Sequence, residues 1–191
     1  MKLKVLSIAV LGLIFVASCN KLKSLVNIEQ DLPFNQSFSL QAAAINDTAV
    51  TNHFPAAGIH YSSANIPVPT NQQQTLSNYK TAANLINSFY IKSLNLSLTP
   101  ATATFNSMDT VNIFICKTVN DSMIIAHKYG VNTTNSIAMD VDTTINLKDY
   151  FLNSTDTFYF KFSGHFKSVP TDSIGQMNIN SVMHLSANPL N

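Results

Sequence analysis

Between Phe158 and Phe166 the chain alternates strictly between two kinds of side chain, and this pattern limits the fold more than any other feature. One set of positions holds four Phe and one Gly, and the other holds Tyr159, Lys161, Ser163 and His165. A period of two places the two sets on opposite sides of an extended strand. The segment is therefore predicted to be a half-buried β-strand with its Phe side on a core and its polar side, His165 included, in solvent.

The same period recurs along most of the chain. Residues 111–116 are apolar on both faces, which predicts a central strand. Further strands are predicted over residues 38–42, 94–98, 122–127, 144–151 and 177–187. Strands at a spacing of about ten residues, with turn residues between them, favour an all-β fold, an antiparallel immunoglobulin-like β-sandwich.

Two adjoining segments depart from this pattern. Residues 46–70 are predicted to be a loop, because Pro55, Pro67 and Pro69 interrupt helices and are excluded from central strands. The four residues from Thr70 to Gln73 then have the Thr-x-x-Gln form of a capping box. Apolar residues three or four apart follow at Leu76, Tyr79, Ala83, Ile86 and Tyr90. This spacing predicts one short helix over residues 72–85.

The polar residues are mostly uncharged. The 191 residues include 11 Lys, 10 acidic residues and no Arg or Trp, and the formal net charge is +1. Asn, Ser and Thr number 22, 20 and 17. A nucleic-acid binder needs a basic face to displace counterions, so this class of partner is excluded.

The first nineteen residues have the layout of a secretory signal. Lys2 and Lys4 precede a 12-residue apolar run over residues 5–16, and the small residues Ala17 and Ser18 lead to Cys19. The run is shorter than the ~20 residues of a membrane-spanning helix. A signal peptide that is removed is therefore predicted.

The sequence Val16-Ala17-Ser18-Cys19 resembles the lipobox of bacterial lipoproteins. The resemblance implies that residues 1–18 are cleaved and that Cys19 is acylated, since two or more acyl chains hold a protein stably on a membrane. The segment over residues 19–30 is predicted to be a lipidated tether, and the length of the remaining chain fits one sandwich domain over residues 31–191. Asn20 rather than Asp follows the cysteine, which by the same resemblance favours the outer membrane of the cell envelope.

The mature chain also resembles a second group. Residues 91–100, the strand at 111–115, Ile125-Ala126, residues 147–150 and the long last strand together look like uncharacterised small β-sandwich lipoproteins of the Gram-negative envelope. This resemblance implies the fold and carries no activity. With Cys19 acylated, Cys116 has no partner for a disulfide and is expected to be a buried structural thiol.

Motifs with chemical meaning are few. His53 and His60 are seven residues apart and could share a metal, and Asp140 and Asp142 could contribute to a calcium site if the strand is extended. Solvent-exposed turns are the simpler interpretation of both pairs. No nucleophile elbow or phosphate loop is present in the sequence. No catalytic residue, metal site or cofactor is therefore assigned.

The sequence favours a non-enzymatic binding or structural module that is anchored in the envelope and contacts a protein or a polymer. Tyr is an efficient binding residue, and exposed positions at His60, Tyr61 and Tyr159 are the candidate contact residues. The alternative is an envelope hydrolase or metal-dependent enzyme that uses His53, His60 or Asp140. The alternative requires at least two of these three side chains to share one cleft.

Overall fold

The structure, a computed structural model, describes residues 27–40, 54–78, 82–118, 121–131, 135–153, 157–170 and 175–188. Its strands are β1 (Ile28–Ser39), β2 (Ile59–Ser62), β3 (Ile66–Pro69), β4 (Ile86–Thr99), β5 (Met108–Thr118), β6 (Asp121–Tyr129), β7 (Ser136–Ala138), β8 (Asp140–Val141), β9 (Thr157–Phe166) and β10 (Gln176–Ala187). Helical segments are α3 (Gln72–Asn78), the 3-10 turn η2 (Ala83–Leu85) and α4 (Lys148–Asn153).

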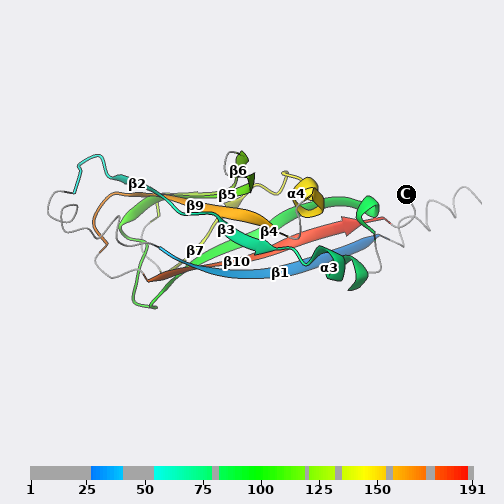
Figure 1. Ribbon diagram of the computed structural model, residues 1–191. Helices are drawn as coiled ribbons and strands as arrows, with labels where there is room; N and C mark the ends of the chain where they lie inside the picture. Colours follow the sequence, from blue (N-terminus) through cyan, green and yellow to red (C-terminus); the bar gives the residue numbers. More distant parts are fainter. Residues whose placement is uncertain are drawn as a thin grey trace, which may run out of the picture.

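Two antiparallel sheets face each other along the length of the molecule (Figure 1). One sheet has the order β1-β10-β4-β7, and the other has the order β2-β9-β5-β6-β8, with β3 pairing β9 beside β2. All of these pairs are antiparallel. The predicted antiparallel β-sandwich is confirmed.

The core lies between the two sheets and is built from the apolar sides of the alternating strands. On β9, Phe158, Phe160, Phe162 and Phe166 are all buried. Phe34 and Phe38 of β1 cross to this strand, with ring centroids 6.0 Å from Phe160 and 5.9 Å from Phe162, respectively. Because β1 and β9 belong to different sheets, these ring pairs join the two layers.

The predicted central strand is confirmed as β5, which pairs β9 on one side and β6 on the other. Ile113 and Ile115 are fully buried on it. The thiol of Cys116 is also buried, and this burial raises the pKa of the thiol above its ordinary value. The prediction of a buried, unpaired thiol at Cys116 is thus confirmed.

The prediction of one helix over residues 72–85 is wrong in its second half. The α-helix ends at Asn78, a 3-10 turn covers residues 83–85, and Ile86 already begins β4. Ile86 and Tyr90, predicted on the helical face, pair instead with Ala187 and His184 of β10. Pairing with this long strand overrides a helical spacing that was only local.

Two further predictions need correction. Residues 59–62 and 66–69, predicted as loop, form β2 and β3. Pro67 and Pro69 are tolerated because β3 is an edge strand, and both prolines are exposed while Ile66 and Val68 are buried. The strand predicted over residues 144–151 does not form, because residues 144–147 contain no strand and residues 148–151 begin α4. Asn146 Oδ1 accepts a hydrogen bond from the Lys148 amide at 3.0 Å at the start of this helix.

The boundary of the predicted tether also changes. Strand β1 begins at Ile28 and pairs with β10 from its first residue, so residues 28–30 belong to the sheet. Cys19, the signal segment and His53 lie outside the described residues. Among the residues that the structure describes, no helix is long and apolar enough to cross a membrane.

Candidate functional site

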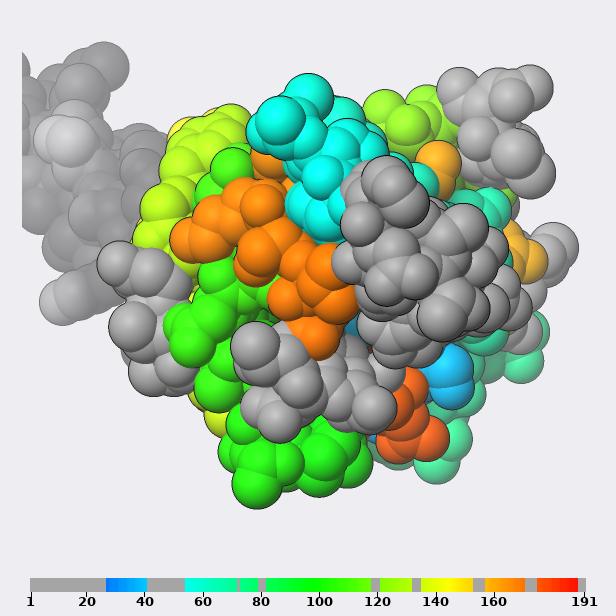
Figure 2. All heavy atoms as spheres, turned by 90° about the vertical axis from the view of Figure 1, so that its left-hand side faces the viewer, coloured from blue at the N-terminus to red at the C-terminus, as the bar shows by residue number. Residues whose placement is uncertain are grey.

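Strand pairing on the outer face of the six-stranded sheet creates a polar hollow beside His60. His165 lies opposite His60 of β2 and Thr110 of β5, and Ser163 lies opposite Asn112. The hollow has a volume of about 230 Å³, and we call it the His60 pocket; it is lined by His60, Asp109, Thr110, Asn112, Ser163, Gly164 and His165. Figure 2 views the end of the molecule where residues 54–62 lie against the end of β9.

His165 is held in place by two acceptors. Its Nδ1 lies 2.8 Å from Asp109 Oδ1, and its Nε2 lies 3.0 Å from the Ala57 carbonyl oxygen. Because a carboxylate and a carbonyl only accept hydrogen bonds, both ring nitrogens must carry a proton. The Ala57 carbonyl and then the Asp109 carboxylate raise the pKa of His165. The imidazolium therefore fastens the segment before β2 to β9 and β5.

The pKa of the Asp109 carboxyl group is shifted in the opposite direction to that of His165. Desolvation by burial is the largest single influence on Asp109 and opposes its ionisation. The hydrogen bonds with His165 and Thr110 and the charges of His165 and Lys167 together outweigh it, so the pKa of Asp109 is lowered. The pair is thus an ion pair with a side-chain exposure of 20% for His165 and 41% for Asp109. The prediction that His165 is simply solvated is wrong, because the residue is half-buried and paired.

The pocket can form hydrogen bonds but lacks a base at His165. Both nitrogens of His165 are engaged, so this ring cannot take a proton from the neighbouring Ser163. The ring of His60 packs against that of His165 at a centroid distance of 4.5 Å, and His60 itself is exposed. Asn112, Thr110 and Ser163 add an amide and two hydroxyl groups. This set suits recognition of a polar, hydrogen-bonding group.

The two predicted Tyr residues lie in different places. Tyr61 points towards the core, with ring centroids 6.1 Å from Phe162 and 6.4 Å from Phe166, and it lines a groove of about 410 Å³ that His60 also borders. Tyr159 lies on the outer face of β9, six residues before His165. At about 3.3 Å per residue this separates the two by roughly 20 Å. Only His60 and Tyr61 are therefore brought together.

Two residues of the enzyme alternative, His60 and Asp140, do not converge, and the third, His53, lies outside the described residues. His60 is on β2 and Asp140 is on β8, the opposite edges of the six-stranded sheet. Lys128 Nζ donates to Asp140 Oδ1 at 3.1 Å, and Asp142 Oδ1 accepts from the amide and the hydroxyl of Thr144. The Asp140 carboxylate thus forms an ion pair, and the Asp142 carboxylate stabilises a turn. Among the described residues, no group of three or more His, Cys, Asp or Glu side chains could hold a metal ion.

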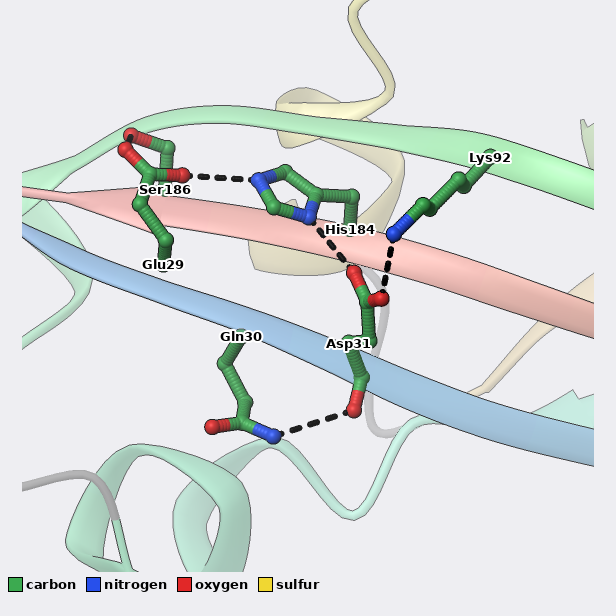
Figure 3. Close-up of polar contacts among 6 residues, drawn as sticks. All are labelled: Glu29, Gln30, Asp31, Lys92, His184 and Ser186. Atoms are coloured by element: carbon green, nitrogen blue, oxygen red, sulfur yellow. Dashed lines mark hydrogen bonds and ion pairs between the residues drawn. The ribbon is translucent and has the colours of Figure 1, made fainter.

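A second polar cluster lies on the outer face of the other sheet (Figure 3). His184 of β10 bridges two residues of β1: its Nδ1 is 2.7 Å from Asp31 Oδ1 and its Nε2 is 2.7 Å from Glu29 Oε2. Lys92 Nζ of β4 donates to Asp31 Oδ2 at 2.6 Å. Ser186 Oγ donates to Glu29 Oε1 at 2.9 Å. The network links three adjacent strands.

The charges of this cluster compensate each other. Both ring nitrogens of His184 face carboxylates, so the ring is an imidazolium, and with Lys92 it balances Glu29 and Asp31. The hydrogen bond with Asp31 is the main reason that the pKa of His184 is raised. Partial desolvation opposes this shift, and the hydrogen bond with Glu29 adds to it. His184 and then Lys92 lower the pKa of Asp31. The arrangement stabilises strand pairing and, like that of His165, leaves no free base.

Neither ion network could be recognised from the spacing of residues in the sequence. Asp109 and His165 are 56 residues apart, and Glu29 and His184 are 155 apart, so no local spacing connects them. A weak signal was present, because Glu29 and Asp31 share one side of a strand and His184 and Ser186 share one side of another. The strand register was needed to place the two pairs together.

Comparison with known proteins adds little. No family model and no curated protein matches the chain. Solved structures that align include desmodium yellow mottle tymovirus (12% identity over 86% of this chain and 91% of that chain, TM-score 0.26) and a decameric BFDV capsid protein (10%, 83% and 98%, 0.33). Infectious bursal disease virus Gx strain aligns at 12% identity over 85% of this chain but only 32% of its own, with a TM-score of 0.28. Likeness at this level carries no argument about function.

Proposed function

We propose that this chain is a lipid-anchored, non-enzymatic binding module of the bacterial outer membrane. The observation that carries the anchor is the run Val16-Ala17-Ser18-Cys19 after a 12-residue apolar segment. β1 begins only nine residues after Cys19, so the acylated cysteine would hold the sandwich close to the membrane surface. The proposal is a membrane-tethered sandwich that contacts a protein or polymer of the envelope.

The His60 pocket is the proposed contact site. It combines an exposed imidazole with two hydroxyl groups and an amide, and it is rigidly framed because His165 of β9 joins the segment before β2 to β5. The binding role is supported by the engagement of both nitrogens in His165 and His184, which removes two imidazoles from proton transfer. A pocket of hydrogen-bonding groups then serves recognition rather than bond cleavage.

Substitution Cys19→Ala tests the anchor. We expect loss of labelling by radioactive palmitate and release of the protein from the membrane fraction, because acylation needs the thiol and the acyl chains supply the membrane affinity. Ser18→Ala, which keeps a small residue before the cysteine, is the matched control and should retain both properties. Unchanged labelling and retention of Cys19→Ala would contradict the proposal.

Site-specific photo-crosslinking in cells tests the contact site. A photoreactive residue in place of Ser62, exposed beside His60, should give a discrete adduct, whereas one in place of Thr143, exposed near the opposite sheet edge, should not. Adduct formation from position 62 should fall when Asn112→Ala and Ser163→Ala remove two pocket groups. Equal adducts from both positions, or an adduct insensitive to these substitutions, would place the contact elsewhere.

A further inference from the structure

The His60 pocket continues across the outer face of the six-stranded sheet towards β6. Residues that lie directly opposite each other on neighbouring strands share one face of a sheet. One such row consists of His60 (β2), His165 (β9), Thr110 (β5) and Tyr129 (β6), and the row beside it consists of Ser163, Asn112 and His127. We call these seven residues the His60–Tyr129 strip. Because neighbouring strands lie about 4.8 Å apart, the strip is roughly 14 Å long.

An exposed ring lies at each end of the strip. Tyr129 is 64% exposed, and its ring packs beside that of His127 at a centroid distance of 4.8 Å. At the other end, the exposed ring of His60 packs beside that of His165. A rigid aromatic side chain offers a large contact area to a ligand at a low cost in conformational entropy. Both ends of the strip are therefore suited to contact an apolar surface of a ligand.

Hydrogen-bonding groups lie between the two ends. The register shift between Met108 and Thr110 brings Asp109 to this face, where its side chain is 41% exposed and lines the hollow together with Asn112. A carboxylate has about four lone-pair sites, and the hydrogen bonds with His165 and Thr110 use only part of them. The amide of Asn112 can both donate and accept. The middle of the strip can therefore bind hydroxyl groups of a ligand.

The charges of the hollow disfavour an ionic ligand. Among the described residues that line it, Asp109 and His165 form an ion pair at 2.8 Å. An anionic ligand would be repelled by the Asp109 carboxylate, and a cationic ligand would be repelled by the His165 imidazolium. A neutral ligand that carries many hydroxyl groups avoids both costs.

The strip lies at the end of the molecule away from the start of β1 (Figure 1). His60 borders one groove with Ser37 and Ser39, near the end of β1, whereas the strand begins at Ile28. At about 3.3 Å per residue, β1 covers roughly 35 Å between these points. If Cys19 holds the start of β1 at a membrane, the strip faces the aqueous space. A polymer in that space, rather than a lipid of the anchoring membrane, can then reach it.

One class of ligand fits these features. The C–H groups on the face of a sugar ring are apolar and pack against aromatic rings, and its hydroxyl groups both donate and accept hydrogen bonds. We propose that the His60–Tyr129 strip binds a neutral oligosaccharide, with sugar rings against Tyr129 and His60 and hydroxyl groups bonded to Asp109 and Asn112. The strip is long enough for a di- or trisaccharide. This ligand class rests on the binding role proposed for the His60 pocket.

Calorimetric titration of the full mature chain in nanodiscs tests this ligand class. The probes are maltotriose, cellotriose, laminaritriose, mannotriose and chitotriose, which are neutral and differ in sugar or linkage. At least one should bind with a dissociation constant on the order of 1 mM or below. Its monosaccharide should bind about tenfold more weakly, because one ring cannot contact both ends of the strip. Trigalacturonic acid, whose carboxylates would face Asp109, should not bind.

Substitutions in the strip separate its two kinds of contact. Tyr129→Ala should lower the affinity for the bound trisaccharide about 2- to 12-fold, the range of one ring contact, whereas Tyr129→Phe keeps the ring and the affinity. Asn112→Ala should cause a loss of about the same size, the range of one hydrogen bond. Tyr159→Ala, on the same face but away from the strip, is the matched control and should keep the affinity. Because Tyr129 is exposed, its substitution should leave the unfolding temperature unchanged.

Three results would overturn the oligosaccharide ligand: no binding of any neutral trisaccharide at about 10 mM, tighter binding of trigalacturonic acid, or equal affinity in wild type and Tyr129→Ala. Photo-crosslinking from position 62 separates this failure from failure of the proposed function. A discrete protein adduct without saccharide binding would overturn the ligand class and keep the contact site. Absence of both the adduct and saccharide binding would contradict the binding role of the His60 pocket itself.

Discussion

At the scale of single residues, the two half-buried imidazoles are the most constrained polar groups. His184 lies between two carboxylates, and His165 lies between a carboxylate and a backbone carbonyl. In each case the two acceptors fix the ring as an imidazolium, and both of its N–H groups are engaged in hydrogen bonds. Both rings therefore join strands, and their protonation becomes linked to folding.

This linkage predicts the dependence of stability on pH. The pKa values of His184 and His165 are raised above 6.5 in the folded protein, so their contribution is fully present below pH 6.5 and is lost as pH rises through the folded values. Asp31 and Asp109 have pKa values lowered below 3.8 in the folded protein. Their contribution to stability is therefore present above pH 3.8 and is lost as pH falls through the lowered values. Urea unfolding should show greatest stability between these limits.

The double variant His184→Gln, His165→Gln isolates the imidazoles. Its free energy of unfolding should be lower than that of wild type at pH 6 and should decline less between about pH 6.5 and pH 8.5. His127→Gln, on the other face of β6 from the core, is the matched control. A wild-type stability that rises over this alkaline range would contradict the assignment of two imidazolium groups.

At the scale of elements, the start of β2 depends on one backbone conformation. Gly58 has a φ of +76°, its amide donates to the Pro55 carbonyl at 2.9 Å, and a Cβ there would collide with the His165 ring and the Phe166 carbonyl. The turn thus brings Ala57 within reach of His165. Element and residue support each other, because the same imidazolium that needs the Ala57 carbonyl leaves no room for a side chain at Gly58.

A pair of glycine substitutions separates this collision from backbone strain. Gly58→Ala should destabilise the protein by about 2–4 kcal/mol, because it combines strain with a clash against backbone. Gly130→Ala also has a positive φ, +63°, but a Cβ there meets nothing within 4 Å, so it should cost only about 1 kcal/mol. Chemical denaturation measures both. Equal losses would mean that the close approach to His165 has no energetic weight.

At the scale of the whole molecule, uncharged polar side chains of Asn, Ser and Thr line the outer face of the four-stranded sheet. Asn35, Asn180 and Asn95 lie side by side on three neighbouring strands of the four-stranded sheet. In the next row Ser37 Oγ donates to Asn178 Oδ1 at 2.6 Å, and Asn178 Nδ2 donates to Thr99 Oγ1 at 3.1 Å. Amides and hydroxyls therefore satisfy each other across strands, which is how this face remains polar with few charges.

Whole-molecule stability should depend on the ring pairs that join the sheets. Phe162 is fully buried and contacts Phe38 of the opposite sheet, so Phe162→Ala should cost about 3–5 kcal/mol. Ile124 is 45% exposed on the outer face, and Ile124→Ala should change stability by less than about 0.5 kcal/mol. Thermal unfolding followed by circular dichroism compares the two. A small loss for Phe162→Ala would mean that the sheets are held together by other contacts.

The sequence by itself determined the sandwich class, the buried faces of β9 and β10, the central place of β5 and the buried thiol of Cys116. It could do so because a period of two, or an unbroken apolar run, is a local property that directly states which side chains avoid water. It also identified His60 as a contact candidate, although without Asp109, Asn112 or Ser163.

Only the tertiary structure decided the register and everything that depends on it. The start of β4 at Ile86, the edge strands β2 and β3, the helix at 148–153 and both imidazolium networks follow from pairings between distant segments. Such pairings reward contacts that no short window of sequence contains, such as Glu29 with His184 across 155 residues.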